Sequence, residues 1–149
     1  MLRLLGTILV FAVTLFFSGN SIGSSSVEDA VQKRIGMFKS SGANIKKLSK
    51  FIRSGDINAS IKLVDFHVKW SKDMHLLFPV GSEASVSNGS DASSDIWGDL
   101  TGFKKRVDQY HLSAKELRKA LKSKNVSSIN ENFDGLVGTC KSCHKQFRN

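Results

Sequence analysis

Apolar side chains recur every three or four residues along most of the chain beyond residue 26, and this spacing constrains the fold more than any other feature. The clearest run alternates steps of four and three without a break, through Ile96, Leu100, Phe103, Val107, Tyr110, Ala114, Leu117 and Leu121. Such a run is typical of a helix in a bundle. Pro79 is the one proline, and no run of period two indicates a strand. The sequence therefore predicts an all-α fold.

Four helical segments are predicted. The first covers about residues 27–52, and the second runs from residue 56 to 78, where Pro79 ends it. The third begins near Ile96 and continues to Leu121, and the fourth begins near Ser128, which forms an S-x-x-E capping box with Glu131. Because the first and third connections are short, we expect an antiparallel up-down-up-down four-helix bundle.

Residues 80–94 are rich in glycine, serine, asparagine and aspartate, and they predict a surface loop. A connection of this length is unusual in a compact bundle. It is therefore a candidate functional loop.

The first residues have the pattern of a secretory signal: Arg3 carries a positive charge, residues 4–17 are apolar, and small polar residues follow. We predict a signal peptide over residues 1–23, cleaved between residues 19 and 26, and a single domain over residues 24–149. The mature protein would be periplasmic, without stable membrane insertion. A retained membrane anchor is the alternative.

The formal net charge of +9 predicts a surface that attracts anions. Nucleic acid is a poor candidate, because the lysines and arginines are spread along the whole chain and an exported protein rarely meets it. Acidic redox partner proteins, anionic lipid head groups and bound carboxylates fit better. A solvated basic surface without a specific partner is the plainer alternative.

The two cysteines lie near the end of the chain in the motif C-x-x-C-H, formed by Cys140, Cys143 and His144. A disulfide between them would close only a tiny loop and stabilise little. Thiols at positions i and i+3 of a helix project to one side, where both can add to the two vinyl groups on one porphyrin edge. We therefore predict one covalent haem c per chain, with His144 as the axial iron ligand.

Redox and zinc chemistry at this motif would each need features that the chain lacks. A thioredoxin-like pair needs a sheet and usually opens a helix. A structural zinc site needs further ligands, and His67, His75 and His111 are spread over other predicted helices. We expect His67 and His75 on a polar face or at an interface. A chance occurrence of the motif is the remaining alternative.

With these motifs the chain resembles the cytochrome c′ family, whose members are four-helix bundles with C-x-x-C-H near the C-terminus. The resemblance covers essentially the whole predicted mature chain. It rests on these segments: Glu28-Asp29-Ala30-Val31, Arg34 four residues before Phe38, residues 77–82, Ile96-Trp97, Cys140 to His144, and Phe147-Arg148.

The resemblance implies roles for particular residues. Cys140 and Cys143 would be the thioether anchors, and His144 the proximal ligand. The implied haem contacts are Arg34 (through a propionate), Ile35, Ser93 and Ser94. Arg148 would be either the basic residue near the proximal imidazole or a cation favoured by the helix C-terminus. Relatives often pair as homodimers through their first two helices, and they are associated with nitric oxide binding and electron transfer.

The position that faces the open side of the iron decides the mechanism, and the resemblance assigns it to Phe38. Phenylalanine has no lone pair, so the haem is expected to be five-coordinate and high-spin. Low-spin relatives carry methionine here, and Met37 lies next in the sequence, about 100° around the helix. The alternative is therefore a low-spin electron shuttle with Met37 as sixth ligand.

An apolar distal pocket would favour small neutral gases, nitric oxide and carbon monoxide, over dioxygen, which gains negative charge on iron and needs a hydrogen-bond donor. We therefore expect a protein of electron transfer and gas binding rather than an enzyme. A haem enzyme that reduces nitric oxide or peroxide is a second alternative. Peroxide chemistry would require a distal acid–base group, and we assign none.

Overall fold

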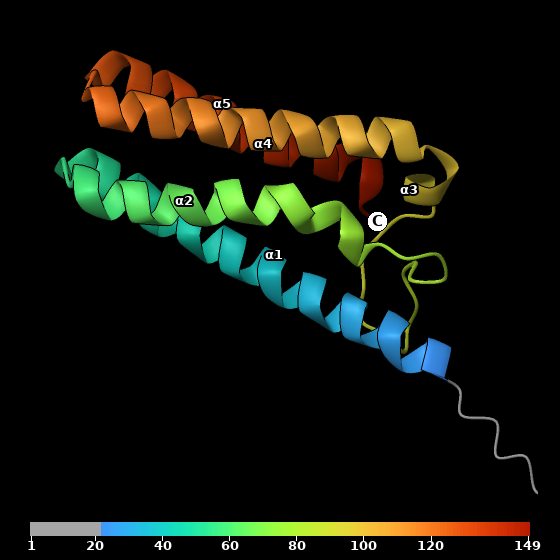
Figure 1. Ribbon diagram of the computed structural model, residues 1–149. Coiled ribbons are helices and arrows are strands. Elements are labelled where there is room, and N and C mark those ends of the chain that lie inside the picture. Colours follow the sequence, from blue (N-terminus) through green and yellow to red (C-terminus); the bar gives the residue numbers. More distant parts are fainter. Residues whose placement is uncertain (1–21) are drawn as a thin grey trace, which may run out of the picture.

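A computed structural model describes the backbone of residues 22–149 and the side chains from residue 26 (Figure 1). The described elements are, in order, α1 (Ile22–Ser54), α2 (Ile57–Asp73), the 3₁₀ turn η1 (Met74–Leu77), α3 (Asp95–Gly98), α4 (Leu100–Ser123) and α5 (Val126–Phe147). Residues 1–21 lie outside the described part, and the predicted signal peptide stays a prediction.

The long helices form two antiparallel hairpins, α1 with α2 and α4 with α5, which lie side by side in Figure 1. The hairpins join mainly along α2 and α4, whereas α1 and α5 meet over only a short stretch. The described residues contain no strand, only an isolated bridge between Ala92 and Arg148. No helix within residues 22–149 is long and apolar enough to cross a membrane. The predicted all-α, up-down-up-down four-helix bundle is confirmed.

The two short connections have local causes. Between α1 and α2, Gly55 takes a φ of +75°, which glycine adopts without strain, and the Asp56 side chain then accepts a 2.9 Å hydrogen bond from the Ala59 amide. Between α4 and α5, Lys124 adopts the left-handed conformation at φ 57° and ends α4. Each turn reverses the chain within a few residues and so sets the antiparallel pairing.

The predicted third helix is wrong in one respect, because it breaks at Asp99 into the short α3 and the long α4. The Asp99 carboxylate caps α4 by accepting a 2.8 Å hydrogen bond from the Gly102 amide. A Cβ at residue 102 would lie 2.0 Å from an Asp99 carboxylate oxygen, which explains the glycine there.

The capping box at Ser128 is also wrong. Helix α5 begins two residues earlier, at Val126, and its N-cap is Asn125. The Asn125 side chain accepts a 3.0 Å hydrogen bond from the Ser128 amide, so Ser128 belongs to the first turn of the helix.

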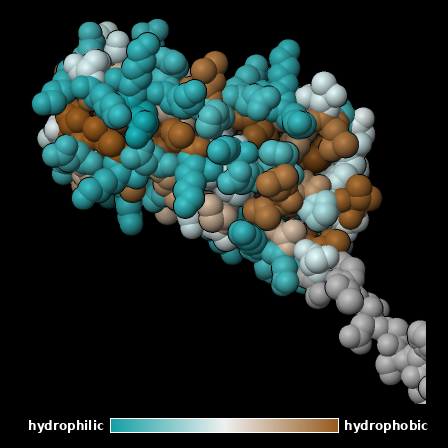
Figure 2. Space-filling view, in the orientation of Figure 1, coloured by the Kyte–Doolittle hydropathy of each residue, from teal (hydrophilic) through white to brown (hydrophobic). Residues whose placement is uncertain are grey.

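The core fills the space between the two hairpins. Its fully buried apolar side chains come from all four long helices: Val31, Leu48, Val64, Ala114, Leu117, Leu121 and Leu136. Burial of each large side chain contributes about 1.5–3 kcal/mol to folding. Hydrophilic side chains cover most of the face shown in Figure 2, in keeping with the charge on the chain.

Candidate functional site

The two cysteines lie one helical turn apart on the same side of α5. Both side chains are half-buried, pack against the hydrophobic core, and are free thiols. The Cys140 thiol donates a weak hydrogen bond to the Leu136 carbonyl at 3.6 Å. Burial raises the pKa of both thiols, that of Cys143 to about 11. At neutral pH the protein thus holds two protonated thiols next to each other against its core.

His144 follows directly on α5 and places its ring against α1. The His144 ring lies 6.1 Å from the Phe38 ring, between centroids, at an interplanar angle of 66°. Partial burial lowers the pKa of His144, and the positive charge of Arg148 lowers it further. The imidazole is therefore neutral at neutral pH and keeps a nitrogen lone pair that can be donated to a metal.

Phe38 occupies the centre of an aromatic cluster on the α1 side. Its ring makes edge contacts with Trp70 at 5.5 Å and with Phe78 at 6.4 Å, in addition to its contact with His144. Met37 is half-buried and packs against the hydrophobic core. The structure thus brings Phe38 to His144. The assignment of the sixth iron ligand itself stays a prediction.

Arg34 lies one turn before Phe38 and is 2% exposed. Its guanidinium donates hydrogen bonds to four acceptors: the Leu77 carbonyl at 3.0 Å, Ser82 Oγ at 2.7 Å, the Ser82 carbonyl, and Ser90 Oγ at 2.7 Å. The same group stacks 4.6 Å over the Phe78 ring. Arg34 therefore holds the loop of residues 78–94 against α1, and its contact with a haem propionate stays a prediction.

The loop is also fastened to the end of α5. The Ser93 amide donates to the Phe147 carbonyl at 3.1 Å, and Arg148 forms an ion pair with Asp91 at 2.6 Å. Ser93 is buried and Ser94 is exposed, and Ile35 on α1 is half-buried. The structure thus brings the loop carrying the two serines next to the last turn of α5, and their haem contacts, with that of Ile35, stay predictions.

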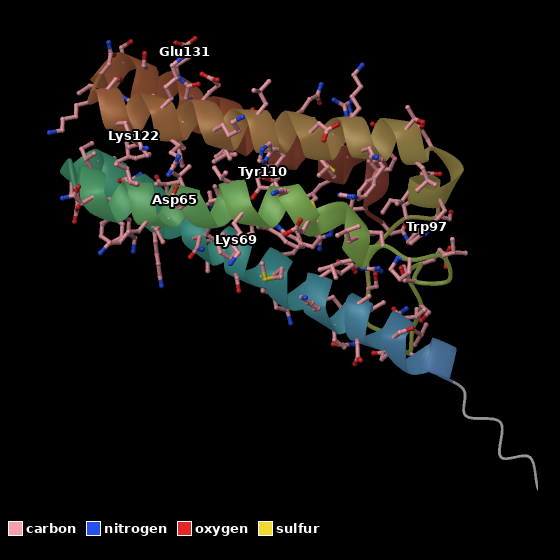
Figure 3. The ribbon with its side chains drawn as sticks, in the orientation of Figure 1. Asp65, Lys69, Trp97, Tyr110, Lys122 and Glu131 are labelled. Atoms are coloured by element: carbon pink, nitrogen blue, oxygen red, sulfur yellow. The ribbon has the colours of Figure 1, made fainter. Side chains whose placement is uncertain are left out.

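A buried polar cluster lies deeper in the bundle, and sequence reasoning missed it. His67 was expected at a polar face or interface, but it is fully buried, which corrects that expectation. Its Nδ1 lies 2.6 Å from the Tyr110 hydroxyl and 3.4 Å from Ser41 Oγ, and these two oxygens are 3.3 Å apart. In Figure 3, Tyr110 lies between α4 and α2. The available signal was Tyr110 itself, since a buried tyrosine hydroxyl usually has a partner.

Two buried nitrogens beside the aromatic cluster have no hydrogen-bond partner in the described part of the chain: Trp70 Nε1 and His67 Nε2. Buried polar atoms without partners are rare in proteins, and they suit a site that accepts a further group. Residues 22–149 bring together no three side chains of His, Cys, Asp or Glu that could hold a bare metal ion. A haem supplies four of its own nitrogens to the iron, so the paired thiols and the single histidine fit it.

A four-helix bundle whose last helix carries two adjacent half-buried thiols and, beside them, an exposed, neutral imidazole in contact with Phe38 of α1 defines a class: the bundle-type proteins that attach haem. Comparison with known proteins narrows the class. The family model for cytochrome c′ matches residues 29–148. The chain belongs to the cytochrome c′ family, whose members carry covalently bound haem c.

Individual relatives agree with this assignment. Cytochrome c′ of Rhodospirillum rubrum is 34% identical over 71 residues, which cover 48% of this chain and 47% of that protein. The match thus spans about half the length of that relative. Cytochrome c′ of Pararhodospirillum photometricum is 27% identical over 126 residues, which cover 83% of this chain and 99% of that protein.

Two solved structures show the same fold. One is the nitric oxide complex of a mutant cytochrome c prime from Alcaligenes xylosoxidans, with a TM-score of 0.72 and 21% identity over 83% of this chain and 95% of that one. The other is a cytochrome c′ with ligand-controlled dimer dissociation, with a TM-score of 0.76 and 14% identity over 82% and 95% of the two chains.

Proposed function

We propose that this chain is a periplasmic cytochrome c′ that binds small neutral gases and transfers electrons through one five-coordinate haem. Cys140 and Cys143 would form the two thioether bonds, and His144 would be the single protein ligand of the iron. The observation that carries the proposal is the position of Phe38. Its ring is the side chain that faces His144, and it has no lone pair to donate.

The chain's own residues suit these roles. The two half-buried thiols share one side of α5, so that both can reach one porphyrin edge. Phe38, Trp70 and Phe78 form an aromatic cluster, and this cluster would line the side opposite His144. When bound, the haem supplies an iron that accepts a diatomic gas and changes oxidation state by one electron.

The partners follow from the surface and from the family. The net charge of +9 suits an acidic redox protein. Binding of nitric oxide is supported by the complex of the Alcaligenes xylosoxidans relative, and a homodimer is supported by the relative whose dimer dissociates under ligand control. Export by an N-terminal signal peptide would place the protein in the periplasm, where its two thiols can be joined to haem. We propose a binding and electron-transfer role rather than an enzymatic one.

The test is an absorption spectrum of the haem-loaded protein, matured in a periplasm that attaches haem. We expect a high-spin ferrous spectrum that changes when carbon monoxide or nitric oxide is added. Phe38→Met should give a low-spin spectrum and slow the binding of carbon monoxide, because a thioether would then lie opposite His144. Met37→Leu is the matched control and should leave the spectrum unchanged.

Two results would contradict the proposal. A denatured protein that is colourless and has the mass of the bare polypeptide would exclude covalent haem. A low-spin wild type that becomes high-spin in Met37→Leu would instead assign the sixth ligand to Met37 and give a closed electron shuttle.

A further inference from the structure

The buried polar cluster of Ser41, His67 and Tyr110 lies one helical turn from the contact between Phe38 and His144. Ser41 follows Phe38 by three residues on α1, and His67 precedes Trp70, the ring partner of Phe38, by three residues on α2. At a rise of about 1.5 Å per residue, each step is about 4.5 Å along the helix. Two helices thus independently place the cluster in the next layer of the bundle.

The same layer contains the first cysteine of the motif. Cys140 precedes His144, the ring partner of Phe38, by four residues on α5, which runs antiparallel to α1, and so Cys140 and Ser41 lie in the same layer. The cluster therefore lies in the layer of Cys140, which would hold one edge of the haem.

His67 lies on the helix that contacts Phe38 through Trp70. It belongs to α2, which packs against α1 and α4, whereas His144 belongs to α5. Trp70, one turn further along α2, makes the ring contact with Phe38. His67 thus belongs to the same helix as Trp70, the ring partner of Phe38, and not to the helix that carries the predicted iron ligand.

The contacts of His67 allow a tautomer that carries the hydrogen on Nε2. Burial raises the pKa of Tyr110, so its phenol stays protonated, and burial lowers the pKa of His67 to about 4, so its ring is neutral. In the tautomer that we assign, the Tyr110 hydroxyl donates to Nδ1 across the 2.6 Å between these two atoms. A neutral ring that accepts at Nδ1 carries its hydrogen on Nε2, which has no acceptor within residues 22–149.

We propose that His67 Nε2 donates a hydrogen bond to an anionic or strongly polar ligand on the open haem face, with Ser41 and Tyr110 fixing the orientation of the ring. This inference rests on the proposed function, and it makes the distal pocket mixed in character. Phe38 would limit access and exclude water. His67 would select ligands that carry negative charge.

The test compares two probes on haem-loaded protein: fluoride on the ferric form, which accepts hydrogen bonds, and carbon monoxide on the ferrous form, which accepts almost none. In His67→Leu the fluoride affinity should fall about tenfold, as expected for the loss of one hydrogen bond, while the carbon monoxide affinity stays unchanged. His67→Gln, whose side-chain amide offers a donor near the Nε2 position, should recover part of the fluoride affinity.

Two further variants make the comparison specific. His111→Leu is the matched control, since His111 is paired with Ser71 at 2.9 Å in a different hollow, between α2 and α4, and it should leave both affinities at the wild-type values. Tyr110→Phe keeps the packing but frees Nδ1, so it should lower the fluoride affinity by less than His67→Leu does.

The inference is overturned if His67→Leu keeps the wild-type fluoride affinity, or if His111→Leu loses as much as His67→Leu. It is also overturned if the wild type binds carbon monoxide but no fluoride. A failure of the proposed function would look different. In that case the wild-type protein would carry no covalent haem, or its spectrum would not respond to carbon monoxide.

Discussion

Replacement of Arg34 by methionine should be among the most destabilising single changes outside the apolar core. Methionine keeps the apolar stem but removes all four hydrogen bonds from the guanidinium to Leu77, Ser82 and Ser90. Each buried acceptor left without a donor costs about 1–3 kcal/mol, and the lost stacking on Phe78 adds about 1 kcal/mol. Because the four acceptors share one donor group, their costs are not additive, and we expect a loss of about 3–5 kcal/mol in the free energy of unfolding.

The assay is urea unfolding of the haem-loaded protein at neutral pH, followed by far-ultraviolet circular dichroism. Arg53→Met is the control, because Arg53 is exposed and donates only to Ser49 on the surface of α1, and it should change the free energy of unfolding by less than about 0.5 kcal/mol. Hydrogen exchange of the amides in residues 82–92 should rise in Arg34→Met, since the loop loses its attachment to α1.

A double-mutant cycle gives the decisive result. Ser90→Ala removes one acceptor of Arg34, so its effect should be smaller by about 1 kcal/mol in the Arg34→Met background than in the wild type. The reasoning is refuted if Arg34→Met costs less than about 1 kcal/mol, or if the two changes are additive within about 0.3 kcal/mol.

Three further predictions concern the core, a cap and acid stability. Leu117→Ala should lower the free energy of unfolding by about 2–5 kcal/mol, because Leu117 is fully buried. Leu112 is 57% exposed, so Leu112→Ala should change the free energy of unfolding little. Equal losses for the two variants, measured by urea unfolding, would contradict the burial of Leu117 in the core. Asn125→Ala should cost about 1 kcal/mol through loss of the α5 cap, again measured in urea. Burial lowers the pKa of His67 to about 4 in the folded protein, whereas the pKa in the unfolded chain is about 6.5. Between these two pH values the unfolded chain therefore binds a proton at His67 that the folded protein does not bind. Stability should fall by up to about 3 kcal/mol between pH 6.5 and 4, and His67→Gln should flatten that dependence.

The helices were predictable because their apolar periodicity is regular and because Pro79 and the polar loop of residues 80–94 separate the second helix from the third. The break at Asp99 could not be predicted, because the apolar spacing continues through this residue. Only the hydrogen bond from the Gly102 amide to the Asp99 carboxylate marks the point where α3 ends and α4 begins. The cap of α5 was misplaced for a similar reason. Asn125 and Ser128 are both good capping residues, and only the backbone geometry distinguishes them.

Within the candidate site, the residues of one helix were predictable and the contacts between helices were not. The C-x-x-C-H motif is local, so its chemistry can be read along α5. The partners of Arg34 lie more than 40 residues away, and those of His67 lie 26 and 43 residues away. A single sequence carries no information on such pairs, and so we predicted a polar face or an interface for a histidine that is buried in the bundle.

The short contact between α1 and α5 has a consequence for assembly. Because the two hairpins are held together mainly along α2 and α4, we expect a chain without its cofactor to open first at the opposite side, by rotation of one intact hairpin against the other. A flat macrocycle could then slide in edge first and reach both thiols without prior unfolding. Once it is bonded to α5 and covered by Phe38 of α1, the cofactor itself would close the bundle and restrain that rotation.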